Sequence, residues 1–364
     1  MFGNWGYARA SGQASTSRTG TLLVPDRDDS AYLVGTIENA VSSGEPIAIL
    51  GHGSKPRLVE SDDIAFLCTS DHTGIIDYRP DELVITARSG TSLEEIQEVV
   101  HAQGQMLPSD PPMFNRKGTV GGAIASGLSG PGRPWYGSTR DSLLGVEVVN
   151  GKGQRLNFGG KVIKNVAGFD IARLYAGSKG TLGLILSATF KLLPVSEHEI
   201  TVELERSDVD AFHLLESYSR RSSTLAGSCH SEQTLYLRFA GATSAVQQDF
   251  STLNGASVCS SFSWSELRDQ NLSFFGDSSP LWRVSLDRGN LYQNIDELSV
   301  LSEWNGSLVW VKTPTESPPP VSTDVGRVEP FRHLGVQPKS SLKYASRLKQ
   351  AFDPLGIFEP EVVV

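Results

Sequence analysis

The sequence predicts an α+β fold in two successive units, followed by a C-terminal helix. Helical and strand-like hydrophobic patterns alternate around glycine loops through residue 193. Pro194 and the polar residues 196–199 then interrupt the pattern, and a second series of strands and helices follows. The 364 residues are enough for two compact domains, each with its own core.

The first unit mixes helices with strands. Ser92 and Glu95 have the spacing of a capping box, which predicts a helix starting at residue 93, and Gly104 ends that helix. Residues 143–158 predict a β-hairpin around the turn Asn150-Gly151. The other expected elements of this unit are a helix at 28–41 and strands at 47–50, 83–87 and 182–193.

The second unit is expected to be a small antiparallel sheet with helices. Its patterns predict strands at 200–204 and 234–239 and helices at 209–220 and 245–253. Residues 313–330 are rich in Pro, Ser and Thr and predict an ordered loop or a linker. A final helix is expected at 340–352. The domain boundaries that follow are a flexible N-terminal segment at 1–24, a first domain at 25–195, a second at 196–339 and a C-terminal helix and tail at 340–364.

Composition excludes several classes of protein. The formal charge of −9, without a long basic run, argues against a nucleic-acid surface. Cys68, Cys229 and Cys259 are isolated, so they indicate neither a disulfide framework nor a metal site, and they fit a reducing cytosol. No apolar stretch approaches the ~20 residues that span a bilayer, and residues 1–20 lack the apolar core of a secretory signal.

Two glycine-rich runs, at 118–137 and 177–184, are the most informative feature of the chain. Ordering glycine costs more backbone entropy than ordering any other residue, so such density indicates backbone that must approach something bulky. A dinucleotide diphosphate is a common object of this kind. The spacing at 145–152 does not match a phosphate-binding P-loop, and no GxGxxG opens a helix after a strand. The runs therefore predict the walls of a flavin nucleotide site.

The order and spacing of these segments resemble the PCMH-type FAD-binding domain of the vanillyl-alcohol oxidase superfamily over residues 25–195. The matching segments are 47–55, Thr119-Val-Gly-Gly122, 136–151 and 177–184. This resemblance implies a two-lobed FAD-binding domain followed by a smaller α+β cap domain, with the C-terminal helix returning to the FAD-binding domain.

Further segments are similar to the FAD-binding subunits of bacterial glycolate oxidase. They are 105–108, 127–135, 158–160, 162–168, 281–285 and 353–358. The resemblance implies a noncovalent FAD and a complex with a paralogous flavoprotein subunit and an iron–sulfur subunit. Such a complex oxidises glycolate to glyoxylate. It also implies a cytoplasmic location, where any association with the inner face of the membrane would come through partners.

Backbone amides at 51–55 would hold the diphosphate, as successive amides in a turn form an anion-binding nest, although an ordinary strand and turn is the alternative. The flavin would approach the backbone at 119–122, and main-chain groups at 180–184 would contact adenine and ribose. The predicted cofactor-binding residues are Gly51, His52, Gly53, Ser54, Lys55, Pro108, Thr119, Val120, Gly121, Gly122, Ala123, Ser126, Gly127, Arg133, Tyr136, Gly137, Gly177, Gly180, Thr181, Gly183 and Leu184.

Several charged residues are candidates for binding an anion. Arg133 or Arg140 could pair with phosphate or a substrate carboxylate. For Arg140, which is next to Asp141, a solvated side chain or a structural ion pair is the favoured alternative. Lys164 and Arg173 could anchor a carboxylate, and a surface ion pair is an equal alternative for Arg173. Relatives with a covalent flavin carry the histidine two positions after His52, so His52 is expected to contribute its backbone.

The chain also departs from the hydroxy-acid oxidising relatives. They carry a His-Pro-Gly-Asp-Gly-Asn-type cluster that supplies a base, and none of the seven histidines here has that setting, so no catalytic residue is assigned. Lys179 replaces a Glu common in relatives, and 359–364 replaces their Asn-Pro-Gly-Arg ending. Two alternatives therefore stay open. One is a self-sufficient FAD-dependent dehydrogenase of a small 2-hydroxy acid such as D-lactate, and the other is a noncatalytic assembly subunit.

Overall fold

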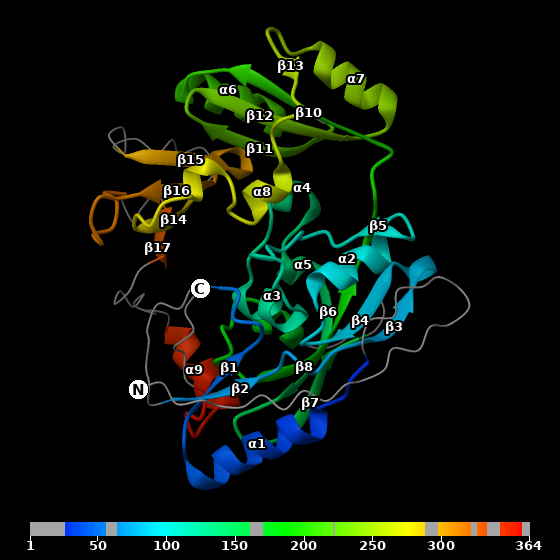
Figure 1. The fold of residues 1–364 in the computed structure, drawn as a ribbon, viewed down its shortest axis with the longest axis vertical. Coiled ribbons are helices and arrows are strands. Elements are labelled where there is room, and N and C mark those ends of the chain that lie inside the picture. Colours follow the sequence, from blue (N-terminus) through cyan, green and yellow to red (C-terminus); the bar gives the residue numbers. More distant parts are fainter. Residues whose placement is uncertain are drawn as a thin grey trace, which may run out of the picture.

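The computed structural model describes residues 26–55, 64–160, 170–220, 223–287, 298–321, 326–332 and 343–358. The chain forms two lobes, each built on its own antiparallel sheet (Figure 1). Helices and strands are mixed along the sequence, so the predicted α+β class is confirmed. Residues 1–24, Lys164 and the tail after Phe358 lie outside the described residues.

The first lobe contains a five-stranded sheet in the order β3-β4-β8-β6-β7. Strand β8 is buried along nearly its whole length, which fits its central place in the sheet. Helices α2 and α3 pack on this sheet, and their apolar residues join its core. The bounds are β3 Ile75–Arg79, β4 Val84–Arg88, α2 Leu93–His101, α3 Val120–Ser126, β6 Leu143–Val149, β7 Arg155–Gly159 and β8 Leu184–Lys191.

Helix α2 begins where the sequence predicts. Ser92 is its N-cap, and the Ser92 hydroxyl and the Glu95 carboxylate form the reciprocal hydrogen bonds of a capping box. The hairpin of β6 and β7 is also confirmed, but its left-handed residue is Gly153, with a φ of +73°, rather than one at the predicted Asn150-Gly151 turn. Asn150 Oδ1 instead accepts hydrogen bonds from the amides of Lys152 and Gln154 and shapes the longer loop.

A second, two-stranded sheet lies to the left of β8 in Figure 1 and consists of β1 (Ile47–Leu50) and β2 (Ala65–Cys68) in parallel. Phe358 extends this sheet through a parallel bridge to Ile47. Helix α1 (Ser30–Ser43) packs on it through Leu33 and Ile37. Helix α9 (Lys343–Phe352) contacts the core of the five-stranded sheet through Leu348 and Phe352, so the C-terminal helix returns to the first lobe as predicted.

The second lobe holds an eight-stranded sheet in the order β13-β10-β12-β11-β15-β16-β14-β17, in which every pairing is antiparallel. Helices α6 (Asp208–Ser219) and α7 (Thr243–Ser251) pack against its β10–β12 part. The strands are β10 His198–Glu205, β11 Leu225–Ser231, β12 Thr234–Gly241, β13 Ser257–Val258, β14 Leu281–Leu286, β15 Ser299–Glu303, β16 Leu308–Lys312 and β17 Gly326–Arg332.

This sheet is larger than the sequence predicts. Strands β14, β15 and β16 are short apolar runs whose period does not distinguish strand from buried helix. Residues 326–330, predicted as loop or linker, belong to β17 and pair with β14. Shorter elements connect the lobes or flank the sheets. They are β5 Gln105–Met106, α4 Arg133–Tyr136, α5 Thr139–Ser142, β9 Leu193–Pro194 and α8 Trp264–Arg268.

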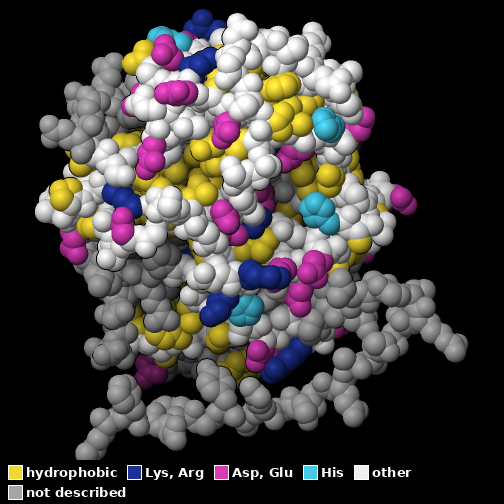
Figure 2. All heavy atoms as spheres, turned by 45° about the horizontal axis from the view of Figure 1, so that its top comes forward, with side chains coloured by type: hydrophobic (Ala, Val, Ile, Leu, Met, Phe, Trp, Pro, Cys, Tyr) yellow, Lys and Arg dark blue, Asp and Glu magenta, His cyan; other side chains and the backbone are white. Residues whose placement is uncertain are grey.

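Across the described ranges, no helix has the length and apolar character that crossing a membrane requires. Figure 2 shows one face of the molecule, on which Lys and Arg side chains are interspersed with Asp and Glu. No large basic area is seen on that face, which agrees with the net negative charge of the sequence.

Candidate functional site

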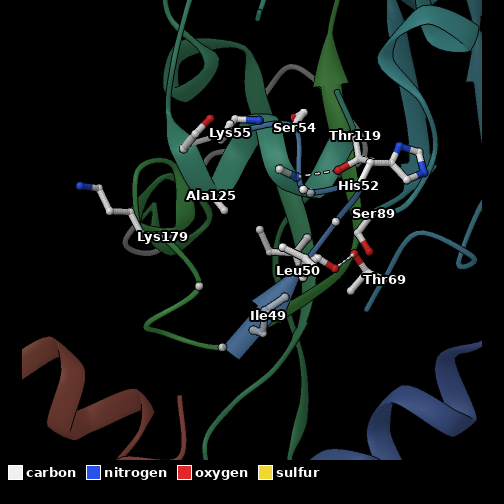
Figure 3. Close-up of a pocket in the computed structure, with 18 residues that line it drawn as sticks. Ile49, Leu50, His52, Ser54, Lys55, Thr69, Ser89, Thr119, Ala125 and Lys179 are labelled. Atoms are coloured by element: carbon white, nitrogen blue, oxygen red, sulfur yellow. Dashed lines mark hydrogen bonds between the residues drawn. The ribbon is translucent and has the colours of Figure 1, made fainter. Parts of the chain in front are cut away.

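One cleft that the described residues form lies in the first lobe. It is bordered by the end of β1, the start of α3 and the loop that precedes β8 (Figure 3). Its cavity volume is about 90 Å³, and it opens to solvent.

The first wall of the cleft is the loop at 51–55. Strands β1 and β2 are parallel, so they end at the same edge, where the Thr69 amide and hydroxyl donate to the Leu50 carbonyl at 2.8 and 3.3 Å. Gly53 adopts a φ of +63°, a conformation that favours glycine. The loop backbone borders the cleft, and consecutive amides in such a turn are suited to binding an anion.

The second wall is the first turn of α3. Thr119 is its N-cap, and Thr119 Oγ1 accepts a 3.1 Å hydrogen bond from the Gly122 amide. The Gly121 amide donates to the Ser89 carbonyl at 2.7 Å, and a Cβ on Gly121 would lie 2.9 Å from Ser89 Cβ. Glycine at 121 is therefore required by the contact between α3 and the end of β4, whatever the cleft holds.

The third wall is the segment at 177–183. The amides of Gly177 and Lys179 donate to the carbonyls of Ile124 and Ala125, at 2.9 and 2.8 Å, which attaches this segment to the end of α3. A Cβ on Gly183 would lie 2.5 Å from the Val149 carbonyl oxygen, so this glycine is needed for the approach to β6. A Cβ on Gly180 would lie 3.6 Å from Ile49 and would narrow the cleft.

The structure thus brings together the three predicted glycine segments around one cleft. The predicted residues that line it are Gly51, His52, Gly53, Ser54, Lys55, Thr119, Gly121, Gly122, Ser126, Gly180 and Gly183. In Figure 3 the imidazole of His52 extends to the opposite side of the loop from Lys55.

Other predicted residues do not line this cleft. Pro108, Val120, Ala123 and Leu184 are buried, the last three in apolar cores. Gly127, Gly177 and Thr181 lie in the segments that form the walls without lining the cavity. Arg133, Tyr136 and Gly137 lie at helix α4, which contacts β11 of the second lobe.

Two of the charged candidates form other contacts. The Arg133 guanidinium lies over the Trp304 ring of the second lobe, 4.6 Å from its centroid. Arg173 forms an ion pair with Asp170, which is the alternative that the sequence allows. Arg140 is exposed to solvent, which agrees with the solvated form of the alternative that the sequence allows. Asp141 accepts hydrogen bonds from the amide and hydroxyl of Ser138. These bonds lower the pKa of Asp141.

The sequence analysis missed several residues that line the cleft, and two of these carry hydroxyls. Thr69 directly follows β2 and Ser89 directly follows β4. Ser89 is 1% exposed, and its Oγ has no hydrogen-bond partner within the described ranges. A polar residue directly after a buried strand was the available signal, but its use requires knowing which strands end beside the cleft. The others are Ile49, Leu50, Ala125, Lys179 and Ile185.

Two lysines give the cleft its charge. Burial lowers the pKa of Lys55 to about 8. Burial also lowers the pKa of Lys179, while the nearby Glu329 of the second lobe opposes this shift. In Figure 3 the Lys179 side chain extends away from the other lining side chains, whereas Lys55 lies beside Ser54.

A smaller cavity of about 20 Å³ lies at the junction of the two lobes. Its lining includes Glu303, which is 5% exposed and accepts a 2.7 Å hydrogen bond from Trp310 Nε1. Burial raises the pKa of the Glu303 carboxyl to about 7. Arg268, which also lines this cavity, forms an ion pair across the junction with Asp110 at 2.8 Å.

Comparisons with known proteins fit this geometry. Residues 28–159 match the FAD binding domain family. The glycolate oxidase subunit GlcE of Escherichia coli (strain K12) is 35% identical over 350 residues, which are 93% of this chain and 98% of that protein. The chain belongs to the GlcE family of glycolate oxidase subunits.

One further sequence relative and one solved structure come from outside the GlcE family. The glycolate oxidase subunit GlcD of Bacillus subtilis (strain 168) is 35% identical over 137 residues, covering 38% of this chain and 29% of that protein. The solved structure of alkyldihydroxyacetonephosphate synthase has a TM-score of 0.64 at 14% identity, covering 92% of this chain and 76% of that one. The second likeness therefore shows a shared fold across both lobes.

The residues of the cleft fit the FAD that this family implies. The Ser89 hydroxyl borders the cleft and has no hydrogen-bond partner among the described residues. Gly122 and Gly180 leave space that a Cβ would fill, toward Lys55 Nζ at 3.5 Å and Ile49 at 3.6 Å. A cleft with a turn of consecutive amides on one side suits a dinucleotide with a central diphosphate.

Proposed function

We propose that this chain is the FAD-binding subunit of a complex that oxidises glycolate to glyoxylate. The observation that carries this proposal is the convergence of three glycine segments, from distant parts of the sequence, on one cleft. The GlcE relative aligns with nearly the whole chain, so the proposal extends to both lobes.

The three walls of the cleft have separate roles in this proposal. Amides at 51–55 bind the diphosphate, the backbone at 119–122 lies against the flavin, and main-chain groups at 180–183 contact adenine and ribose. Bound FAD supplies the acceptor for the hydride of a 2-hydroxy acid. The domain assignment follows from these roles: residues 25–195 form the FAD-binding domain and 196–339 form the cap.

We propose that turnover requires partner subunits. Hydride loss from a 2-hydroxy acid is easier when a base takes the hydroxyl proton, and the sequence offers no histidine cluster for this task. The partners are a paralogous flavoprotein like GlcD, which shares a segment of sequence with this chain, and an iron–sulfur subunit. A cytoplasmic complex that reaches the membrane only through such partners fits these assignments.

The visible spectrum of the purified chain, recorded before and after anaerobic addition of glycolate, tests this proposal. Bound flavin that stays oxidised until the partner subunits are added supports it. Bleaching of the flavin by glycolate or D-lactate in the chain alone would establish a self-sufficient dehydrogenase instead. A folded protein that does not bind added FAD would establish an assembly subunit without a flavin role.

A further inference from the structure

Among the described residues, the amine of Lys55 has no counter-charge in the cleft. No carboxylate of those residues forms an ion pair with Lys55 Nζ, and burial alone shifts its pKa. The amine lies over the ring of Phe114, 5.9 Å from the ring centroid. A partly buried ammonium that faces a cavity and has no anion beside it is unfavourable until a ligand supplies negative charge.

The position of Lys55 indicates which part of a dinucleotide would supply that charge. Phe114 is buried among residues of the second lobe and lies 6.3 Å from the ring of Phe331. Lys55 therefore marks the end of the cleft that faces the junction of the lobes. Gly180 and Ile49 face each other in another part of the cleft, and in Figure 3 Ile49 lies far from Lys55.

In the proposed function the loop amides at 51–55 bind the diphosphate, so the diphosphate has partners other than the Lys55 side chain. The Lys55 amine lies beyond them, beside the position that a Cβ of Gly122 would take, at 3.5 Å. Gly122 belongs to the segment against which the flavin lies in the proposed function. The flavin ring is thus the part of the ligand placed to meet this amine.

We infer that Lys55 is a positioning residue for the flavin ring and that its ammonium balances the negative charge that the ring gains on reduction. This inference rests on the proposed function. Reduction adds two electrons and one proton to the ring at neutral pH and leaves one negative charge on it. A fixed cation beside the ring stabilises that charge and raises the midpoint potential. The negative charge of the reduced flavin favours the ammonium form of Lys55. At a pH where Lys55 is neutral beside the oxidised flavin, it therefore takes up a proton when the flavin is reduced.

The test is the two-electron midpoint potential of the FAD-loaded chain at pH 7, measured by reductive titration with a reference dye. Lys55→Met is expected to lower the equilibrium constant for flavin reduction at least tenfold. This corresponds to a midpoint potential lower by about 30 mV for a two-electron couple. Lys55→Gln provides a second neutral variant in case the first does not fold. Lys55→Arg keeps the charge and is expected to retain the original potential. Lys117→Met, at an exposed lysine outside the cleft, is the matched control.

The possible outcomes separate this inference from the proposed function. Neutral variants that bind FAD with an unchanged potential overturn the inference and leave the proposed function intact. Another outcome is that neutral variants bind FAD more weakly but keep the midpoint potential. That result would mean that the ammonium contacts the diphosphate and would also overturn the inference. If the unaltered chain binds no FAD, the proposed function fails and the inference fails with it.

Discussion

The indole of Trp310 donates a 2.7 Å hydrogen bond to the carboxyl of Glu303, inside the junction between the two lobes. The two residues belong to neighbouring antiparallel strands, β15 and β16, on either side of a short connection. Burial raises the pKa of Glu303, and this effect is larger than the lowering by the hydrogen bond from Trp310 and by the nearby Arg283. The burial of this carboxyl makes the stability of the fold depend on pH.

Glu303→Gln is expected to remove much of that dependence. The pKa of Glu303 is about 7 in the folded chain and near its ordinary 4.5 when unfolded, so the folded state holds the proton more tightly. The resulting stabilisation is complete below pH 4.5 and is lost as the pH rises through about 7. Its full size is about 3 kcal/mol.

The measurement is chemical denaturation of both proteins between pH 5 and pH 8. The glutamine amide oxygen can still accept from Trp310, so the variant should unfold at a higher denaturant concentration than the unaltered chain at pH 8. Parallel pH profiles for the two proteins would contradict the assignment.

Gly121→Ala is expected to destabilise the first lobe. The new methyl group would lie 2.9 Å from Ser89 Cβ and 3.1 Å from the Ser89 carbonyl oxygen, so α3 and the end of β4 must move apart. A cost of roughly 1–3 kcal/mol is expected from thermal or chemical unfolding. Gly35→Ala is the matched control, since its Cβ has nothing within 4 Å and alanine favours the interior of α1. Equal stabilities for the two variants would be inconsistent with the close contact.

Ser89→Ala is expected to weaken FAD binding without weakening the fold. The Ser89 hydroxyl has no hydrogen-bond partner in the part of the chain that the structure describes, so its removal costs the folded chain little. Loss of one hydrogen bond to the ligand corresponds to a roughly 2- to 10-fold rise in Kd. Fluorescence titration with FAD measures it. Ser178→Ala removes another orphaned hydroxyl, one that does not line the cleft, and should leave Kd unchanged.

Asp353→Ala is expected to loosen the C-terminal attachment to the first lobe. The carboxylate is buried and accepts hydrogen bonds from the amides of Ile357 and Phe358, and it pairs with Lys349 at 2.5 Å. Breaking a buried pair in this way costs about 3–5 kcal/mol. Hydrogen exchange should show faster opening of β1 than in the unaltered chain, because Phe358 is a neighbour of that strand. Unchanged protection of Ile47 and Ala48 would refute the coupling.

The sequence predicted those helices and strands that are determined by residues close together in the chain. The capping box at Ser92 and Glu95 and the apolar spacing of α1 act within one or two turns, so they can be recognised without knowledge of the fold. Strand β11 and the strands beyond β12 were not predicted, because their burial depends on their neighbours in the eight-stranded sheet.

The candidate site could also be predicted only in part. The glycine segments could be predicted to converge because each is rich in glycine, which lets the backbone approach a bulky ligand closely. Ser89 could not be found, since only the register that places β4 beside β8 and α3 brings it to the cleft. Arg133 was associated with the nucleotide, yet its stacking on Trp304 depends on how the second lobe docks.

The bridge between Ile47 and Phe358 has a consequence for how a minimal version of the first lobe could be made. The strand that leads into the loop at 51–55 has a neighbour more than 300 positions away, beyond the entire second sheet. Such a contact forms late, since closing a long loop is slow. A fragment cut after residue 195 would leave one side of β1 bare. To express the first lobe alone, its N-terminal part and the C-terminal segment that holds Phe358 would have to be joined by a short linker in place of the second lobe.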